Sequence, residues 1–285
     1  MRVLIRELFN VKRGDVFNLY PLGDIHDGAA ACDEKLLRRI VDRINKDDGA
    51  RWIGTGDYCD FINPSDKRFS FATLADWIEM PDLLDLPKAQ VNHLLDILRP
   101  IASKCLGLAC GNHEMTIQAK YERNIYSEIV TGIKEAGGFP ADHKLALGYY
   151  GWVMLNFYRS SKKRQSRTTI KANVHHGFVG GRLAGAKALN MQRWLWTHDA
   201  DLVIFGHSHN QMAQPETVEK LDRNGKLVQQ VRRGCYGGTF LKTVNEDGPS
   251  TYSERKGYFP LPVGNPVIRL RPGAEAQRDR VRIVI

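Results

Sequence analysis

The stretch that decides the fold is Phe17-Asn18-Leu19-Tyr20-Pro21-Leu22-Gly23-Asp24-Ile25-His26. A short, mostly apolar run stops at a glycine, and two side chains that can bind a metal ion follow it. Four further runs end in the same way, at Gly56-Asp57, Gly111-Asn112, His175 and Gly206-His207. Runs of this length, bounded by turn residues, predict buried strands.

Stretches with helical spacing separate these runs. They lie at 33–49, where Asp33 can cap the helix, and at about 87–103, 121–136 and 183–197. In each of them apolar residues recur at intervals of three and four. Strands that alternate with helices predict an α/β sheet covered by helices, and such sheets bind their ligands at the strand ends.

Two regions fall outside this alternation. Residues 159–167 contain five basic residues in nine and predict an exposed hairpin loop. After about residue 210 the pattern becomes β-rich: Asn224-Gly225 predicts a two-residue hairpin turn, and Val281-Ile285 a final strand. Because no repeat or long linker is visible, we expect a single domain over 1–285 with a β-rich C-terminal portion.

Composition limits the class of protein. The 285 residues are 42% hydrophobic and 26% charged, as in globular rather than disordered chains. The net charge of +9 favours an anionic partner such as a phosphate ester or a nucleic acid. Five cysteines without a C-x-x-C pair predict free thiols in a reducing compartment. With no signal-peptide pattern and no apolar run of about 18 residues, we expect a cytoplasmic protein without membrane contact.

Five blocks of metal-binding side chains follow the predicted strands. They are Gly23-Asp24-Ile25-His26, Gly56-Asp57-Tyr58-Cys59-Asp60, Gly111-Asn112-His113-Glu114, Val174-His175-His176-Gly177 and Gly206-His207-Ser208-His209. A single block of this kind is usually a polar loop, whereas five at successive strand ends predict one shared site. Carboxylates and imidazoles without cysteine suit Mn, Fe or Zn. Two cations roughly 3.5–4 Å apart also need a shared carboxylate between them.

The spacing within the blocks suggests how the side chains converge. Asp24 and His26 are two residues apart, and so are His207 and His209. On an extended strand end, side chains at this spacing point to the same side, so each pair could reach one cation. The preceding glycines allow the backbone to turn sharply and approach the ions.

In this order, the motifs D-x-H, G-D-x-x-D, G-N-H-E, H-x-G and G-H-x-H resemble those of the calcineurin-like metallophosphoesterases. They span residues 23–209. The resemblance implies a four-layer α/β/β/α sandwich with two divalent metal ions, of which we favour Mn over Fe or Zn. It also implies the ligands. The first ion would be held by Asp24, His26, Asp57 and His209, and the second by Asp57, Asn112, His175 and His207, with Asp57 as the bridge.

The same resemblance implies roles beside the metal ions. His113 would donate to a phosphoryl oxygen or protonate the leaving group, and Asp60 would orient His113. Because the family's pattern is H-x-G, we expect His175 to be the metal ligand and His176 to face the substrate. The reverse assignment of these two histidines stays open.

Differences from the motifs of one subfamily reduce the range of expected substrates. Protein Ser/Thr phosphatases of this family have Arg-Gly after the second block and Arg after the third, whereas this chain has Phe61-Ile62 and Met115. An arginine from elsewhere could bind the phosphate; the candidates are Arg68, Arg123, Arg182 and Arg193, and we take Arg182 as substrate-binding. The aromatic residues Tyr58, Phe61 and Phe178 could stack on a base or line the rim.

These features lead to three functional hypotheses. We expect first a phosphodiesterase acting on a nucleotide or nucleic acid, with nucleic acid bound through the basic loop 159–167. A phosphomonoesterase, acting on a small molecule or a protein, comes second. A scaffold that keeps the fold without catalysis comes third, because every ligand position is filled.

Overall fold

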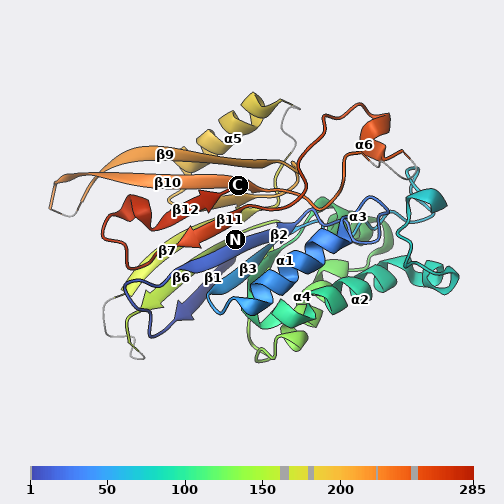
Figure 1. Ribbon diagram of the computed structural model, residues 1–285, viewed down its shortest axis with the longest axis horizontal. Coiled ribbons are helices and arrows are strands. Elements are labelled where there is room, and N and C mark those ends of the chain that lie inside the picture. Colours follow the sequence, from blue (N-terminus) through green and yellow to red (C-terminus); the bar gives the residue numbers. More distant parts are fainter. Residues whose placement is uncertain (1, 161–166, 179–182, 223, 245–249) are drawn as a thin grey trace.

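The computed structural model describes residues 2–160, 167–178, 183–222, 224–244 and 250–285. Two six-stranded sheets lie at the centre of the molecule (Figure 1). The first sheet has the order β12 (Val281–Val284), β11 (Val267–Leu270), β2 (Phe17–Gly23), β3 (Ala50–Gly56), β4 (Cys105–Ala109) and β5 (Ala146–Gly148). The second has the order β1 (Arg2–Leu8), β6 (Tyr150–Tyr158), β7 (Arg167–His175), β8 (Leu202–Phe205), β10 (Leu227–Gly237) and β9 (Gln211–Leu221).

Helices cover the outer faces of both sheets. The first sheet carries α1 (Glu34–Lys46), α2 (Leu86–Leu98) and α4 (Ile125–Ala136), and the second carries α5 (Ala184–Thr197). A further helix, α3 (Asn112–Tyr121), packs on α4 and buries Ile117 on the side of the first sheet, and a short helix, α6 (Tyr252–Arg255), follows β10. There are also 3-10 turns, η1 (Phe71–Thr73), η2 (Met80–Asp85), η3 (Arg99–Lys104) and η4 (Gln277–Asp279). The expected α/β/β/α sandwich is therefore confirmed.

Three apolar clusters hold the four layers together. One joins α1, α2 and α4 to the first sheet, with Trp52 and Leu94 at its centre. A second fills the space between the sheets and includes Ile53 and Ile204. The third joins α5 to the second sheet through Met191. Strands buried on both faces have almost no polar positions, which is why the central runs are continuously apolar.

Most elements follow the sequence pattern, and α1 illustrates the reason. The Asp33 side chain accepts from the Leu36 N–H at 3.0 Å and so caps the helix. The predicted hairpin around Asn224-Gly225 is confirmed by the antiparallel pairing of β9 with β10. The final strand is β12, and β6 pairs antiparallel with β7 around the basic loop. All five cysteines are free.

Two helix predictions are corrected. The helix expected at 121–136 starts at Ile125, because Glu122 adopts a left-handed φ of 54° and Asn124 caps a new helix. Before it lies α3, which the sequence reading missed. The helix expected at 87–103 becomes the 3-10 turn η3 after Leu98, and Pro100 follows there. Strand β1, which was not predicted, pairs parallel with β6 at the edge of the second sheet.

The C-terminal portion contributes strands to both sheets. Strands β9 and β10 extend the second sheet, and β11 and β12 extend the first. This pairing supports the single domain over 1–285, which stays a prediction. Among the described residues, no helix combines the length and apolar character that crossing a membrane requires.

Candidate metal centre

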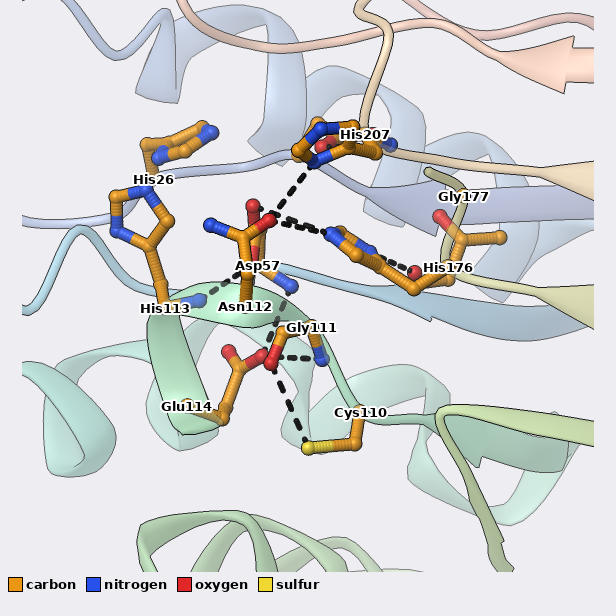
Figure 2. A network of polar contacts seen from close by, with 12 residues as sticks. His26, Asp57, Cys110, Gly111, Asn112, His113, Glu114, His176, Gly177 and His207 are labelled. Atoms are coloured by element: carbon orange, nitrogen blue, oxygen red, sulfur yellow. Dashed lines mark hydrogen bonds and ion pairs between the residues drawn. The ribbon is translucent and has the colours of Figure 1, made fainter. Parts of the chain in front are cut away.

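The five blocks of metal-binding residues meet where strands of the two sheets end (Figure 2). Strands β2, β3 and β4 run parallel in the first sheet, and β7 and β8 run parallel in the second, so their carboxyl ends share an edge. The backbone N–H of His207, after β8, donates to the Asp24 carboxylate, after β2, at 2.8 Å. The site is therefore built from both sheets.

Left-handed backbone conformations bring the side chains together. Asp24, His26, Asp57, His207 and His209 have φ angles of 46°, 53°, 51°, 65° and 56°. Non-glycine residues rarely adopt this region, and such strain gathers at functional sites. The expected extended strand end is therefore wrong. Asp24 and His26 do fall in one group of potential metal ligands, whereas His207 and His209 fall in two different groups. The chain turns tightly at each of these residues instead of continuing the pleat.

Glycines allow the close approach of the turns, as expected. A β-carbon on Gly56, whose φ is 95°, would lie 2.6 Å from the Gly111 nitrogen and 2.6 Å from His176 Nδ1. A β-carbon on Gly111 would lie 2.1 Å from the Asp57 carboxylate. These contacts are far shorter than atoms can tolerate, so both positions require glycine.

Asp24, His26 and His209 form one potential metal-binding group. His26 Nε2 lies 3.2 Å from His209 Nε2, and His209 Nε2 lies 3.5 Å from Asp24 Oδ1. Asp24 is fully buried, and burial raises its pKa well above the usual range. Burial and the neighbouring His26 lower the pKa of His209 well below its usual value. A neutral imidazole beside a buried carboxylate offers a lone pair to a cation.

Asp57, His176 and His207 form a second group, with Asn112 between them. The Asn112 Oδ1 atom lies 2.9 Å from His176 Nε2 and 2.8 Å from His207 Nδ1. His176 Nδ1 donates to the Thr55 carbonyl at 2.7 Å, which leaves Nε2 directed at Asn112 and, 3.4 Å away, at Asp57. Burial opposes charge on His176, but Asp57 outweighs it and raises its pKa to about 9. The negative charge of the buried Asp57 carboxylate is therefore stabilised by a positive charge nearby.

His175 does not join this group, contrary to expectation. Its Nδ1 accepts from the Gly177 N–H at 2.7 Å, and its ring packs edge-on against Trp194 of α5 at 5.0 Å. Burial lowers the pKa of His175 to about 4. Successive residues of a strand point to opposite faces, so His175 faces the α5 layer and His176 faces the site.

His113 and Asp60 come together, but in a different way from that expected. His113 Nδ1 contacts the backbone carbonyl of Asp60, whereas the Asp60 carboxylate lies 4.0 Å from that nitrogen. The carboxylate is closer to His26 Nδ1, at 3.4 Å. Burial opposes charge on His113, but Asp57 and Asp60 outweigh it and raise its pKa. The main chain of Asp60 orients His113, and its side chain faces His26.

Glu114 has a structural role that the sequence reading missed. Its fully buried carboxylate accepts three backbone N–H groups, from Gly111 at 2.7 Å, Tyr58 at 2.8 Å and Asp57 at 3.0 Å. It therefore locks the turn after β3 to the turn after β4 (Figure 2). Its position at the third residue of α3 was the available signal, because a glutamate there often bonds back to the start of a helix.

Two residues outside the blocks also support the site. Lys187 of α5 is 9% exposed, and its Nζ donates to Asn210 Oδ1 at 2.6 Å, just beyond the last block. His93 of α2 stacks on Trp77 and contacts Asp27 Oδ2 at 3.0 Å, next to His26. The partly buried His93 ring thus packs on Trp77 and links α2 to the turn after β2. The sequence alone could not predict the contacts of Lys187 or His93, because it does not show which helix lies against which strand end.

The other proposed substrate residues have mixed outcomes. Tyr58 and Phe61 are 0% and 4% exposed, so neither can stack on a base, whereas Phe178 is 41% exposed. Arg123 is paired with Asp85 and Glu128. Arg182 and most of the basic loop 159–167 lie outside the described residues.

The donor set fits divalent metal ions. The nearby histidines lower the pKa of Asp57 against the effect of its burial, so this carboxylate is ionised. The oxygens of Asp24, Asp57 and Asn112 face imidazole nitrogens of His176, His207 and His209 at hydrogen-bond to ion-pair distances, and His26 Nε2 lies beside His209 Nε2. No cysteine takes part in these groups of described residues. Oxygen and imidazole donors of this kind suit Mn, Fe or Zn.

Comparison with known proteins agrees with the site. The calcineurin-like phosphoesterase family matches residues 18–211, and the chain belongs to this family. None of the curated proteins matches the chain in sequence.

Among solved structures, the chain is similar to a Vps29 double mutant from Entamoeba histolytica, at 12% identity and a TM-score of 0.38, over 94% of this chain and 97% of that one. It is also similar to a predicted phosphoesterase from Streptococcus pneumoniae, at 11% identity and a TM-score of 0.33, over 94% and 97% of the two chains. A third is the NAD nucleotidase NadN of Haemophilus influenzae, at 9% identity and a TM-score of 0.38, over 95% of this chain and 49% of that one.

Proposed function

We propose that the protein is a phosphodiesterase that hydrolyses a nucleotide or nucleic-acid substrate at a binuclear metal centre. One observation carries the proposal. Buried carboxylates from the first sheet and imidazoles from the second converge on one edge, and the pKa of His176 there is raised to about 9. Burying such a set of carboxylates is unfavourable unless cations compensate them.

The two groups of donors correspond to two ion positions. Asp24, His26 and His209 would hold one ion, and Asn112, His176 and His207 the other, with Asp57 bridging. His176 thereby replaces His175 of the sequence-based assignment, because its Nε2 faces Asn112 at 2.9 Å. We favour Mn, with Fe and Zn as alternatives, because carboxylate and amide oxygens are prominent among the donors.

The protein's own residues then position and protonate the substrate. When bound, two divalent cations supply Lewis-acid polarisation of water and of the phosphoryl oxygens. His113 keeps a proton on Nδ1 for the Asp60 carbonyl, and its raised pKa favours a second proton on Nε2. That second proton can be donated to the leaving oxygen, a contribution typically worth roughly 10²–10⁴-fold in rate.

The charge of the site favours a diester over a monoester. Where the family's protein Ser/Thr phosphatases have arginines after the second and third blocks, this chain has Phe61-Ile62 and Met115. A diester carries one negative charge at the scissile phosphate, whereas a monoester near neutral pH carries up to two and benefits more from a guanidinium. The net charge of +9 and the basic loop 159–167 support a nucleic acid as partner. The free cysteines fit a cytoplasmic location.

The test combines metal analysis with two model substrates. Purified protein should contain about two divalent ions per chain. With them it should hydrolyse bis-p-nitrophenyl phosphate with a higher kcat/KM than p-nitrophenyl phosphate. The reverse preference would support the phosphomonoesterase, and metal-loaded protein without activity on either ester would support the inert scaffold.

A further inference from the structure

A pocket lies beside the metal centre, and Asp60 forms part of its wall. The Asp60 carboxylate lies 3.4 Å from His26 Nδ1, and its backbone oxygen accepts from His113. Asp60 therefore stands between this pocket and the imidazoles of the metal centre.

The pocket is held in shape by backbone hydrogen bonds between three segments. Its central segment, residues 29–31, is bonded on one side through Ala30 N to Thr73 O at 2.9 Å. On the other side Lys242 N donates to Ala31 O at 2.8 Å. Figure 1 shows α6 and the segment between β3 and α2 at the same end of the molecule. The pocket is therefore formed before any ligand enters, as ligand sites usually are.

The lining of the pocket is strongly cationic. Arg68, Lys242 and Arg255 line it, and Asp60 is the one carboxylate that does so among the described residues. Asp66 holds the Arg68 guanidinium at 3.0 Å. Lys242 and Arg255 are exposed, and in the described part of the chain no carboxylate forms an ion pair with either of them. Because Asp60 already faces the imidazoles, two positive charges remain for a ligand.

The rest of the lining separates into hydroxyl groups and small apolar side chains. Ser250 and Ser253 line the same pocket as the cations, and Ala29, Ala72 and Leu241 are among its apolar residues. Cations with hydroxyl donors are the usual partners of phosphate oxygens. The alanines leave room for the organic part of a ligand.

We propose that this cationic pocket binds a second phosphate of the substrate whose scissile phosphoester lies at the metal centre. The inference rests on the proposed function, because the metal centre fixes where the scissile phosphate lies. Asp60 belongs both to the wall of the pocket and to the surroundings of His26, so the two phosphates would lie on either side of this residue. The substrate class is therefore a phosphoester that carries a further phosphate.

Binding of two phosphonates tests the pocket. Propylphosphonate carries one anionic group and propane-1,3-bisphosphonate carries two, and the enzyme cannot hydrolyse their carbon–phosphorus bonds. Titration calorimetry on the Mn-loaded protein should show that the bisphosphonate binds about tenfold more tightly, because it gains charge-assisted hydrogen bonds. The corresponding bisphosphonates with butane and pentane spacers then show which distance between the two anionic groups gives the tightest binding. The double variant Lys242→Ala/Arg255→Ala should lose this preference.

The matched control is Lys226→Ala, at the exposed tip of the β9–β10 hairpin. It removes a positive charge outside the pocket and should keep the preference for the bisphosphonate. Chelation of metal by the bisphosphonate is the same for all three proteins and cancels from the comparison. An unchanged preference in the double variant, at every spacer length, or an equal loss in Lys226→Ala, overturns the proposal.

The outcome is separable from that of the proposed function. Turnover of bis-p-nitrophenyl phosphate, which carries no second phosphate, tests catalysis at the metal centre. The ratio of phosphonate affinities is a binding measurement and needs no turnover. An active enzyme without the bisphosphonate preference contradicts only the pocket, and an inactive protein with the preference contradicts only the hydrolase.

Discussion

His175 and His176 are adjacent in the chain but face different layers of the molecule. His176 is fully buried at the metal centre, and His175 packs among aromatic side chains next to α5. A side chain's chemistry is therefore insufficient to make it a ligand: the strand must also turn it to the correct face.

Exchanging each histidine for alanine should separate the two roles. We expect His176→Ala to lose one of the two bound ions together with most of the activity. His175→Ala should keep both ions and instead lose about 2 kcal/mol of unfolding free energy, because it leaves a cavity among the aromatic rings. Plasma mass spectrometry measures the metal content and urea unfolding the stability. If His175→Ala loses the metal and His176→Ala keeps it, the assignment is reversed.

His113 should act on the leaving group without holding a metal ion. We expect His113→Ala to reduce kcat by roughly 10²-fold or more on a diester with a poor leaving group, because proton donation is lost. The metal content should stay unchanged. Full activity of this variant on an alkyl diester would rule out the proposed acid.

Asp60 should affect metal binding more than proton transfer. Its carboxylate lies nearer to His26 than to the His113 nitrogen, at 3.4 Å against 4.0 Å. Asp60→Asn should therefore lower the affinity for the metal about 10–100-fold, as is typical for the loss of a group that orients a ligand. The kcat at saturating metal should fall less than in His113→Ala. Metal titration followed by activity measures both effects, and the opposite order would contradict this role.

At the scale of single elements, α3 shows how a short helix can organise a site. It starts at Asn112, whose amide oxygen lies between His176 and His207. Its third residue, Glu114, bonds to the turns after β3 and β4. Ile117 is the one apolar side chain of this helix that is buried in the core, so the polar contacts at its first turn contribute much of its placement.

Replacing the Glu114 carboxylate should loosen both turns. In Glu114→Gln an NH₂ group takes the place of one acceptor oxygen, and at least one buried backbone N–H loses its partner. We expect a loss of about 2–3 kcal/mol in unfolding free energy, measured by urea denaturation. Glu135→Gln, on the exposed side of α4, is the control and should change stability by less than about 0.5 kcal/mol. Equal losses of unfolding free energy in the two variants would show that Glu114 does not hold the two turns together.

For the whole molecule, the metal centre joins the two sheets. The blocks after β2, β3 and β4 belong to the first sheet, and those after β7 and β8 to the second. Ions bound between them would stabilise the folded state relative to the unfolded chain, in which these ligands are separated. Such stabilisation reaches about 4 kcal/mol for one ion at a thousand times its Kd.

Removal of the metal should therefore lower the melting temperature. We expect EDTA to reduce the Tm of the wild type and to have a much smaller effect on Asp57→Asn, which has lost the bridging carboxylate before chelation. Calorimetry with and without EDTA measures both. A wild-type Tm that is unaffected by EDTA, in protein shown to have lost its metal, would mean that the ions do not hold the sheets together.

The local pattern of the sequence was sufficient for the alternation of the central strands with α1, α2, α4 and α5, for the cap at Asp33, for the hairpin at Asn224-Gly225 and for the residue types at each strand end. These features depend on interactions between residues close in the chain, which spacing and turn chemistry reveal. Tertiary structure alone decided that His176 and not His175 faces the centre, that Asp60 uses its main chain towards His113, and that Glu114, Lys187 and His93 support the site. Those outcomes depend on which face each strand presents and on partners up to about 120 residues away, such as His176 and Thr55. Only the packing of the two sheets fixes them, because the direction of a side chain at a tight turn follows from what surrounds it.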